Sequence, residues 1–195
     1  METNLKALLA ELAEFGGAYD AAAADRMQKM RNITPETGEF LSVLVQATRA
    51  RQVLEVGTSN GYSTLWLADA ARPTGGAVTT LELLEAKAEL ARENFRRAGL
   101  DSVITLRLGD AGEYLRAAAA GSHDFIFLDS ERDLYLGWWL DLQRVLAPGG
   151  LMVVDNFLSH APEVAPFRAM VEATPGYQTS LVPVGTGEWL IYKQQ

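Results

Sequence analysis

Short apolar segments alternate with longer amphipathic segments between about residues 51 and 156. The apolar segments are rich in β-branched side chains and read "VLEV", "AVTTLE", "VITLRL", "DFIFLD" and "LMVVD". The segments between them, such as "LLEAKAELARENFRRAGL", have the length and apolar spacing of amphipathic helices. Strands that alternate with helices predict a parallel sheet with helices on both faces.

The two ends of the chain follow other patterns. The first fifty residues are rich in Ala, Leu, Glu and Lys, which predicts two or three helices. Thr34 and Pro35 form a good helix start, so the last of these helices is expected over residues 35–50. Near the C-terminus, "YQTSLVPV" and "EWLIYK" flank a Gly-Thr-Gly turn and predict an antiparallel pair at a sheet edge. The expected single domain, residues 1–195, therefore has three parts: 1–50, 51–156 and 157–195.

Composition then excludes several kinds of chemistry. The chain has no cysteine, so it can hold neither a disulfide, a thiolate nucleophile nor a zinc–thiolate site. Its 25 acidic and 17 basic side chains give a net charge of -8, which argues against nucleic acid as a partner. The N-terminal residues lack the layout of a signal peptide, and no apolar run reaches the ~20 residues that span a bilayer. We therefore expect a cytoplasmic protein that binds neither nucleic acid nor a membrane.

In parallel sheets, ligands are bound where the strands end. The first strand ends in "LEVGTSNGYSTLWLA", where Gly57 and Gly61 predict a tight turn into a helix that begins near Tyr62. These glycines alone fit a structural turn as well as a ligand cradle, and their spacing differs from the G-x-G-x-x-G of dinucleotide-binding proteins. The second strand ends at Glu82, whose carboxylate is placed to accept both hydroxyls of a ribose. Together, the turn and Glu82 favour an adenosine-type ligand.

Two further strand ends carry polar side chains. The third strand leads into "LGDA", which places Asp110 where its carboxylate can accept from an adenine amino group. Asp110 is equally suited to cap the following helix, and the two roles are compatible. The last parallel strand, in "PGGLMVVDNF", stops at Asp155 and Asn156. A strand that delivers a carboxylate and an amide at its end suggests a site for an oxygen-ligated group.

Four motifs together resemble one family. "VLEVGTSNGYSTLWLA", "LGDAGEYL", "FIFLDSERDLY" and "LAPGGLMVVDN" resemble, in order and spacing, the S-adenosylmethionine-dependent O-methyltransferases related to catechol and caffeoyl-CoA O-methyltransferases. The resemblance covers residues 32–156 and is poor in the tail. It implies a Rossmann-like class I methyltransferase fold: a mostly parallel seven-stranded sheet with an antiparallel last strand, helices on both faces and an N-terminal helical lid. It also implies a homodimer that moves a methyl group to a hydroxyl of a small aromatic acceptor with the help of a divalent cation.

The resemblance implies a role for each matching residue. The residues expected to bind S-adenosylmethionine are Ile33, Glu55, Gly57, Thr58, Ser63, Glu82, Asp110, Ala111 and Asp129. The residues expected to bind the metal ion are Asp129, Asp155 and Asn156. The residues expected to take part in catalysis are Asp129, Arg132 and Asn156.

A physical argument for the metal ion stands beside the resemblance. Asp129 and Asp155 end two apolar strands that should be neighbours, so two carboxylates and the Asn156 amide are expected to converge at one edge of the sheet. This set of oxygen ligands without His or Cys suits Mg²⁺, with Ca²⁺ or Mn²⁺ as alternatives. The opposing interpretation takes the two aspartates as helix caps and Asn156 as a turn residue.

Two positions depart from the family pattern. Arg132 stands where the family usually carries a lysine that acts as general base. Because a guanidinium stays protonated, Arg132 is expected to stabilise a phenolate or to bind a carboxylate or phosphate of the acceptor. The alternative is a solvated arginine paired with Glu131 or Asp133. An acid that catechol-type members carry in the final hairpin falls on Val182 or Pro183, which argues against catechol itself as the acceptor.

Several residues near the expected acceptor pocket have two interpretations. His160 either faces the acceptor or is an ordinary loop residue. Of Trp138 and Trp139, one is expected in the core and the other at the pocket or at a partner surface. Met27 and Met30 suit either a lid over an aromatic acceptor or core packing.

Three rival functions remain open on the sequence. A metal-independent small-molecule methyltransferase would keep the acidic strand ends without using them. A non-catalytic module that binds S-adenosylmethionine is compatible with the missing lysine. A dinucleotide oxidoreductase is disfavoured by the glycine spacing.

Overall fold

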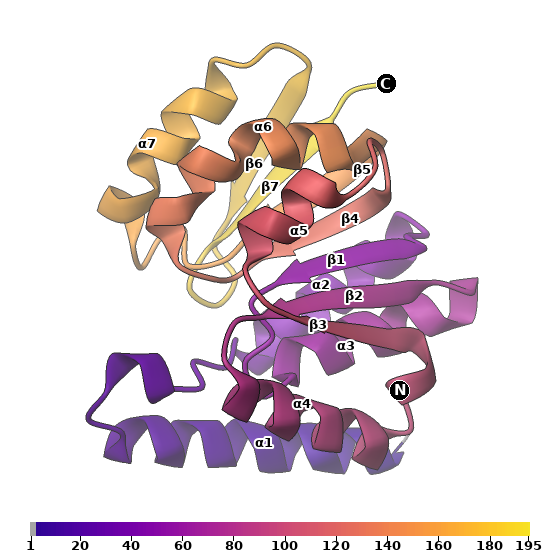
Figure 1. Cartoon of the computed structure of the whole chain (residues 1–195), viewed down its shortest axis with the longest axis vertical. Helices are drawn as coiled ribbons and strands as arrows, with labels where there is room; N and C mark the ends of the chain where they lie inside the picture. Colours follow the sequence, from indigo (N-terminus) through magenta and orange to yellow (C-terminus); the bar gives the residue numbers. More distant parts are fainter. Residues whose placement is uncertain (1–2) are drawn as a thin grey trace.

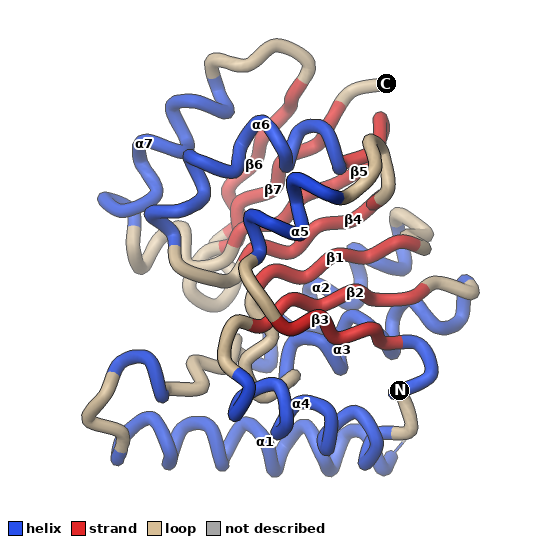
Figure 2. Tube along the Cα trace, viewed as in Figure 1, coloured by secondary structure: helices blue, strands red, loops and turns tan. Residues whose placement is uncertain are grey.

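The computed structural model describes residues 3–195 and shows seven strands in one sheet between two layers of helices (Figures 1 and 2). The strands are β1 Gln52–Val56, β2 Ala77–Glu82, β3 Ile104–Leu108, β4 His123–Leu128, β5 Leu146–Val154, β6 Tyr177–Val182 and β7 Glu188–Lys193. The α-helices are α1 Thr3–Ala22, α2 Pro35–Ala47, α3 Tyr62–Ala71, α4 Glu85–Ala98, α5 Ala111–Ala117, α6 Tyr135–Val145 and α7 Ala161–Glu172. The short 3-10 helices are η1 Arg26–Gln28, η2 Arg72–Thr74, η3 Asp101–Val103 and η4 Arg132–Leu134.

The order of the strands, β3-β2-β1-β4-β5-β7-β6, determines where a ligand can bind. The first five strands in this order pair in parallel, and β7 pairs antiparallel with both β5 and β6. The Rossmann-like sheet with an antiparallel hairpin at its edge is therefore confirmed. The direction of strand order reverses between β1 and β4, and such a switch point is the usual binding crevice of an open α/β sheet.

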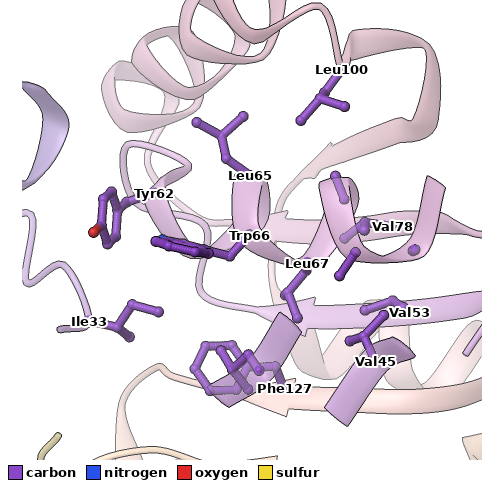
Figure 3. Close-up of a cluster of buried hydrophobic side chains, with 14 of the residues drawn as sticks. Ile33, Val45, Val53, Tyr62, Leu65, Trp66, Leu67, Val78, Leu100 and Phe127 are labelled. Atoms are coloured by element: carbon purple, nitrogen blue, oxygen red, sulfur yellow. The ribbon is translucent and has the colours of Figure 1, made fainter. Parts of the chain in front are cut away.

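The parallel strands β1, β2, β4 and β5 are largely buried on both faces, which explains their apolar runs, whereas β3 at the edge of the sheet is partly exposed. Along β4, Phe125 and Phe127 belong to the core cluster beneath α1 to α4, whereas Ile126 and Leu128 belong to the cluster beneath α5 to α7. Figure 3 shows part of the first cluster, where Leu67 of α3 lies near β1 and β2. Each such side chain contributes about 1.5–3 kcal/mol on full burial.

The N-terminal helices cover one face and one edge of the core. The Thr34 hydroxyl accepts from the Thr37 N–H at 3.2 Å and caps α2 as predicted. This helix ends at Ala47 rather than at residue 50, because Arg49 adopts a positive φ of 55° and turns the chain toward β1. Helix α1 lies along α4 (Figure 1) and buries leucines at helical spacing. Whether it moves as a lid stays a prediction.

Within residues 3–195, none of the helices combines the length and the apolar character that crossing a bilayer requires.

Candidate functional site

A cavity of about 760 Å³ opens at the carboxyl edge of the sheet, beside the switch point between β1 and β4. Its walls are the loops that follow the five parallel strands, together with the segment before α2. The volume is typical of a site for a small molecule or cofactor. The residues that the sequence assigned to the site and that line this cavity are Ile33, Gly57, Thr58, Ser63, Glu82, Asp110, Ala111, Asp129, Arg132, Asp155 and Asn156.

The loop after β1 makes a tight turn against the end of β4. Gly57 has a φ of +106°, and a Cβ at this position would lie 2.0 Å from the carbonyl oxygen of Asp129. The N–H groups of Gly57 and Thr58 both donate to the Leu81 carbonyl, at 3.1 and 3.2 Å. Only glycine fits this close approach, so the turn brings the loop directly beside Asp129.

Glu82 at the end of β2 is held in one orientation by two backbone groups. The Ser59 N–H donates to one carboxylate oxygen at 2.8 Å, and the Leu84 N–H donates to the other at 2.9 Å. Each oxygen of a carboxylate can accept more than one hydrogen bond. The fixed carboxylate therefore keeps acceptor capacity for the paired hydroxyls of a ribose.

The start of α5 forms a further part of the cavity wall, with Asp110, Ala111 and the nearby Trp138. The Asp110 carboxylate accepts from the Glu113 N–H at 2.9 Å and caps α5, which confirms the capping role. Trp138 lines the cavity, and its indole nitrogen lies 2.7 Å from where a Cβ on Gly112 would be. Trp139 is buried in the core, so the two tryptophans divide as the sequence predicted.

Residues 29–32 form another part of the cavity wall. The Asp20 carboxylate at the end of α1 accepts from the N–H groups of Met30 and Arg31, at 2.6 and 2.8 Å. The Ser59 hydroxyl donates to the Met30 carbonyl at 2.7 Å, which ties this segment to the loop after β1. Met27 also lines the cavity and is half-exposed.

The ends of β4 and β5 bring two carboxylates and an amide together. The Asn156 Nδ2 donates to Asp129 Oδ1 at 3.1 Å and to Asp155 Oδ2 at 2.9 Å. The Thr186 hydroxyl donates to Asp155 Oδ1 at 2.6 Å. Neither aspartate caps a helix, so the alternative interpretation of these acids is wrong.

The Asp129 and Asp155 carboxylates lie close enough to repel each other, so a positive group between them would be favourable. Burial, and then the nearby Asp155 carboxylate, raises the pKa of Asp129 well above its usual range. The positively polarised Asn156 Nδ2 now lies between the two carboxylates, where a cation would relieve the same repulsion. Over the part of the chain that the structure describes, no three His, Cys, Asp or Glu side chains are arranged to hold a metal ion. A metal centre here would therefore rely on Asn156 as its third protein ligand, with the amide turned so that Oδ1 rather than Nδ2 faces the acids.

Arg132 lies in the wall of the cavity, and its partner is not one that the sequence suggested. Its side chain is buried, and its Nε donates to the Glu163 carboxylate on α7 at 2.8 Å. Glu131 forms an ion pair with Arg31 rather than with Arg132, with its Oε1 3.6 Å from the Arg31 Nη1. The alternative of a solvated Arg132 paired with a neighbour in the sequence is therefore wrong. His160 also lines the cavity, and its Nδ1 lies 2.8 Å from the Ser159 hydroxyl.

The final hairpin contributes residues that the sequence analysis missed. Val182 and Pro183 are not among the residues that line the cavity, whereas Thr186 is. Glu188, the first residue of β7, is fully buried, and its Oε1 accepts from the Thr37 hydroxyl at 3.0 Å. Burial, followed by the Asp155 carboxylate, raises the pKa of Glu188 to about 10, so this acid is neutral near pH 7. The feature that could have identified Glu188 in the sequence is an acidic residue at the start of an apolar strand.

Glu55, which the resemblance assigned to the cofactor, lies behind the cavity wall. Its carboxylate is fully buried and is not part of the cavity wall. Its oxygens accept from the hydroxyls of Ser63 and Thr80, each at 2.6 Å, and from the hydroxyl of Thr64. The side chain of Glu55 points to α3, so it lies behind Ser63, which does line the cavity, and its expected contact with the cofactor stays a prediction.

Comparisons with known proteins agree with this arrangement. The catechol O-methyltransferase of Mycobacterium tuberculosis is 39% identical over 144 residues, which cover 72% of this chain and 62% of that protein. The catechol O-methyltransferase of Niastella koreensis is 38% identical over 130 residues, which cover 65% of this chain and 58% of that protein. Each match thus spans less than two thirds of the curated relative.

A solved structure is similar over nearly the whole fold. The O-methyltransferase from Bacillus cereus in complex with SAH has a TM-score of 0.80 and 27% sequence identity, covering 96% of this chain and 91% of that chain. The family model described as O-methyltransferase matches residues 3–192. With this match over almost all of its length, and with the strand-end residues gathered around one cavity, the chain belongs to the O-methyltransferase family.

Proposed function

We propose that this chain transfers a methyl group from S-adenosylmethionine to a hydroxyl of a small aromatic acceptor, such as a catechol-like phenol, with the help of a divalent cation. The observation that carries the proposal is the convergence of Asp129, Asp155 and Asn156 in the wall of the cavity. Carboxylate and amide oxygens suit Mg²⁺ best, with Ca²⁺ or Mn²⁺ as alternatives. The family to which the chain belongs supports the reaction type.

The geometry supports a defined orientation of the cofactor. The fixed Glu82 carboxylate would hold the ribose, and Asp110 with Ala111 would lie at the adenine edge. The methionine portion would then lie along the loop after β1, near Thr58 and Ser63. This orientation would place the transferable methyl group toward the ends of β4 and β5, where the acidic cluster lies.

The chain would promote transfer mainly by positioning two reactants. The acceptor oxygen attacks the methyl carbon while the carbon–sulfur bond breaks, and S-adenosylhomocysteine and a proton leave. A cation bound at the acidic cluster supplies Lewis acidity that lowers the pKa of the acceptor hydroxyl. Arg132, fixed by Glu163, adds a permanent positive charge that stabilises the developing oxyanion. Correct alignment of two reactants can lower the barrier by about 7–11 kcal/mol.

The test is methyl transfer from labelled S-adenosylmethionine to a panel of catechols and hydroxycinnamates, with Mg²⁺ and with EDTA. We expect product only with Mg²⁺. Equal product with EDTA would instead support the metal-independent methyltransferase. Absence of product in both arms, with S-adenosylhomocysteine shown to bind, would support the non-catalytic binding module.

Replacing Arg132 by lysine is expected to increase the rate of catechol methylation and to extend activity to lower pH. A lysine amine can lose its proton and act as a general base, which a guanidinium cannot. The increase could reach about 10²-fold, the low end of what a general base contributes. The measurement is the pH dependence of kcat, with Arg168→Lys as control, because Arg168 forms an exposed ion pair with Glu172 on α7. A profile that matches the wild type would mean that this position takes no part in proton transfer.

The homodimer and the cytoplasmic location stay predictions. Light scattering coupled to size-exclusion chromatography would test the first. A mass of one chain would exclude the dimer.

A further inference from the structure

The turn at residues 185–187 joins the final hairpin to the segment that follows β5. The backbone carbonyl of Thr186 accepts from the Leu158 N–H at 3.1 Å. The backbone carbonyl of Gly187 accepts from the Phe157 N–H at 2.9 Å. A Cβ on Gly187 would lie 2.7 Å from the backbone nitrogen of Leu158, so the two segments pack backbone against backbone. The turn is therefore fixed in place beside the proposed metal centre.

Thr186 also reaches the acidic cluster with its side chain. It lines the cavity, and its hydroxyl donates to Asp155 Oδ1 at 2.6 Å. The backbone N–H of Asn156 donates to the same oxygen, also at 2.6 Å. The other oxygen, Asp155 Oδ2, accepts from the Asn156 Nδ2 at 2.9 Å. The two oxygens of this carboxylate thus have different partners.

These partners leave the two oxygens of Asp155 unequally available to a cation. Each oxygen of an ionised carboxylate has two lone pairs. The Thr186 hydroxyl and the Asn156 N–H occupy both lone pairs of Oδ1. The hydrogen bond to Oδ2 comes instead from the Asn156 amide, which has to turn before its own oxygen can bind a metal ion. Once the amide turns, Oδ2 is free and Oδ1 is not.

We propose that Thr186 is a specificity-determining residue of the metal centre, because it restricts Asp155 to coordination through one oxygen and so favours Mg²⁺ over Ca²⁺. The inference rests on the divalent cation of the proposed function. Mg²⁺ demands near-ideal octahedral geometry, whereas Ca²⁺ accepts more ligands in a flexible geometry and often takes both oxygens of one carboxylate. Loss of the Thr186 hydroxyl would free a lone pair on Oδ1 and make that second contact possible.

The experiment measures cation binding by electron paramagnetic resonance, with Mn²⁺ as the probe and S-adenosylhomocysteine present. Free Mn²⁺ gives a signal that is lost on binding, and added Mg²⁺ or Ca²⁺ restores the signal by displacement. The wild type should release Mn²⁺ at a lower concentration of Mg²⁺ than of Ca²⁺. Thr186→Val should bind Mn²⁺ and Mg²⁺ about 10-fold to 100-fold more weakly, as is usual when a hydrogen bond to a metal ligand is removed. Its affinity for Ca²⁺ should change by no more than a few-fold.

Further variants separate the hydrogen bond from the fold. Thr186→Ser keeps the hydroxyl and should keep the wild-type preference for Mg²⁺. Thr179→Val removes a hydroxyl from an exposed position on β6 of the same hairpin, so it should behave like the wild type. Circular dichroism and calorimetric binding of S-adenosylhomocysteine should not distinguish these proteins. If Thr186→Val does not fold, Thr186→Ala repeats the test, because alanine removes the hydroxyl without adding a methyl group to the turn.

Several results would overturn the inference and leave the proposed function intact. A wild type that binds Ca²⁺ more tightly than Mg²⁺ would show that Asp155 is not restricted to one oxygen. Equal losses of affinity for Mg²⁺ and Ca²⁺ in Thr186→Val would reduce the residue to a structural role, and unchanged affinities would exclude any role. A wild type that binds none of the three cations would overturn the proposed metal centre itself, and this inference with it.

Discussion

Replacing Asp155 by asparagine is expected to lower kcat/KM for methyl transfer by about 10³-fold or more, which corresponds to about 4 kcal/mol of transition-state stabilisation. The reason is that the proposed metal centre has only two carboxylates, Asp129 and Asp155. Asparagine keeps the size of the side chain but removes one of the two charges. Affinity for S-adenosylhomocysteine should change by no more than a few-fold, because the residues proposed to hold the cofactor are unchanged.

Asparagine is the better first substitution, because alanine would also destabilise the fold, and a loss of activity could then not be assigned to the metal centre. The Asp155 carboxylate accepts from the Asn156 N–H at 2.6 Å, from the Asn156 Nδ2 and from the Thr186 hydroxyl. Alanine would leave these donors without an acceptor, at about 1–3 kcal/mol for each one that stays buried.

The measurement for Asp155→Asn is kcat/KM as a function of Mg²⁺ concentration, beside calorimetric binding of S-adenosylhomocysteine. The matched control is Asp133→Asn, which removes the same charge from an exposed position close to the site. We expect Asp133→Asn to behave like the wild type. If Asp155→Asn keeps wild-type turnover in EDTA, the acidic cluster is not a metal centre, and the metal-independent methyltransferase becomes the better proposal.

The residues at the strand ends were predictable because parallel strands share one direction. Once Glu82, Asp129 and Asp155 were recognised as the last residues of apolar runs, sheet geometry alone placed them at one edge. The switch point between β1 and β4 was not predicted and comes from the strand order of the structure.

The partners of buried polar groups were not predictable in this way. The resemblance suggested that Glu55 would face the ligand, but its position in β1 points it toward α3, where Ser63 and Thr64 happen to supply hydroxyls. Arg132 pairs with Glu163, which is 31 residues away in the sequence. Such pairings depend on how the loops fold over the sheet, and no local pattern encodes them.

The final hairpin shows a related difficulty. Alignment of the chain ends assigned the acid of catechol-type members to the position of Val182 or Pro183. The buried acid of this hairpin is instead Glu188, at the start of β7. Position along a hairpin depends on the length and shape of its turn, so small differences in the loop move a residue by several places. The structure resolves this because β7 is anchored by its pairing with β5.

Replacing Gly57 by alanine is expected to lower affinity for S-adenosylhomocysteine by at least about 10²-fold and the free energy of unfolding by about 3 kcal/mol or more. Two effects combine. A φ of +106° is unfavourable for any residue with a Cβ. The new Cβ would also lie 2.0 Å from the Asp129 carbonyl oxygen and 2.9 Å from its carbonyl carbon. These are backbone atoms, so no side-chain rotation can relieve the collision.

The matched control is Gly75→Ala, because Gly75 also has a positive φ, of +71°, but no atom lies within 4 Å of its would-be Cβ. The Gly75→Ala variant has the backbone strain of a positive φ but no steric clash of the new Cβ. We therefore expect the free energy of unfolding to fall by only about 1 kcal/mol and the binding of S-adenosylhomocysteine to stay unchanged. Urea unfolding and calorimetry measure the two quantities for both variants. The difference between the variants isolates the contact between the loop after β1 and the end of β4. If Gly57→Ala resembled Gly75→Ala in both quantities, the loop could move away from Asp129 at little cost, and the cofactor and the acidic cluster would not be rigidly coupled.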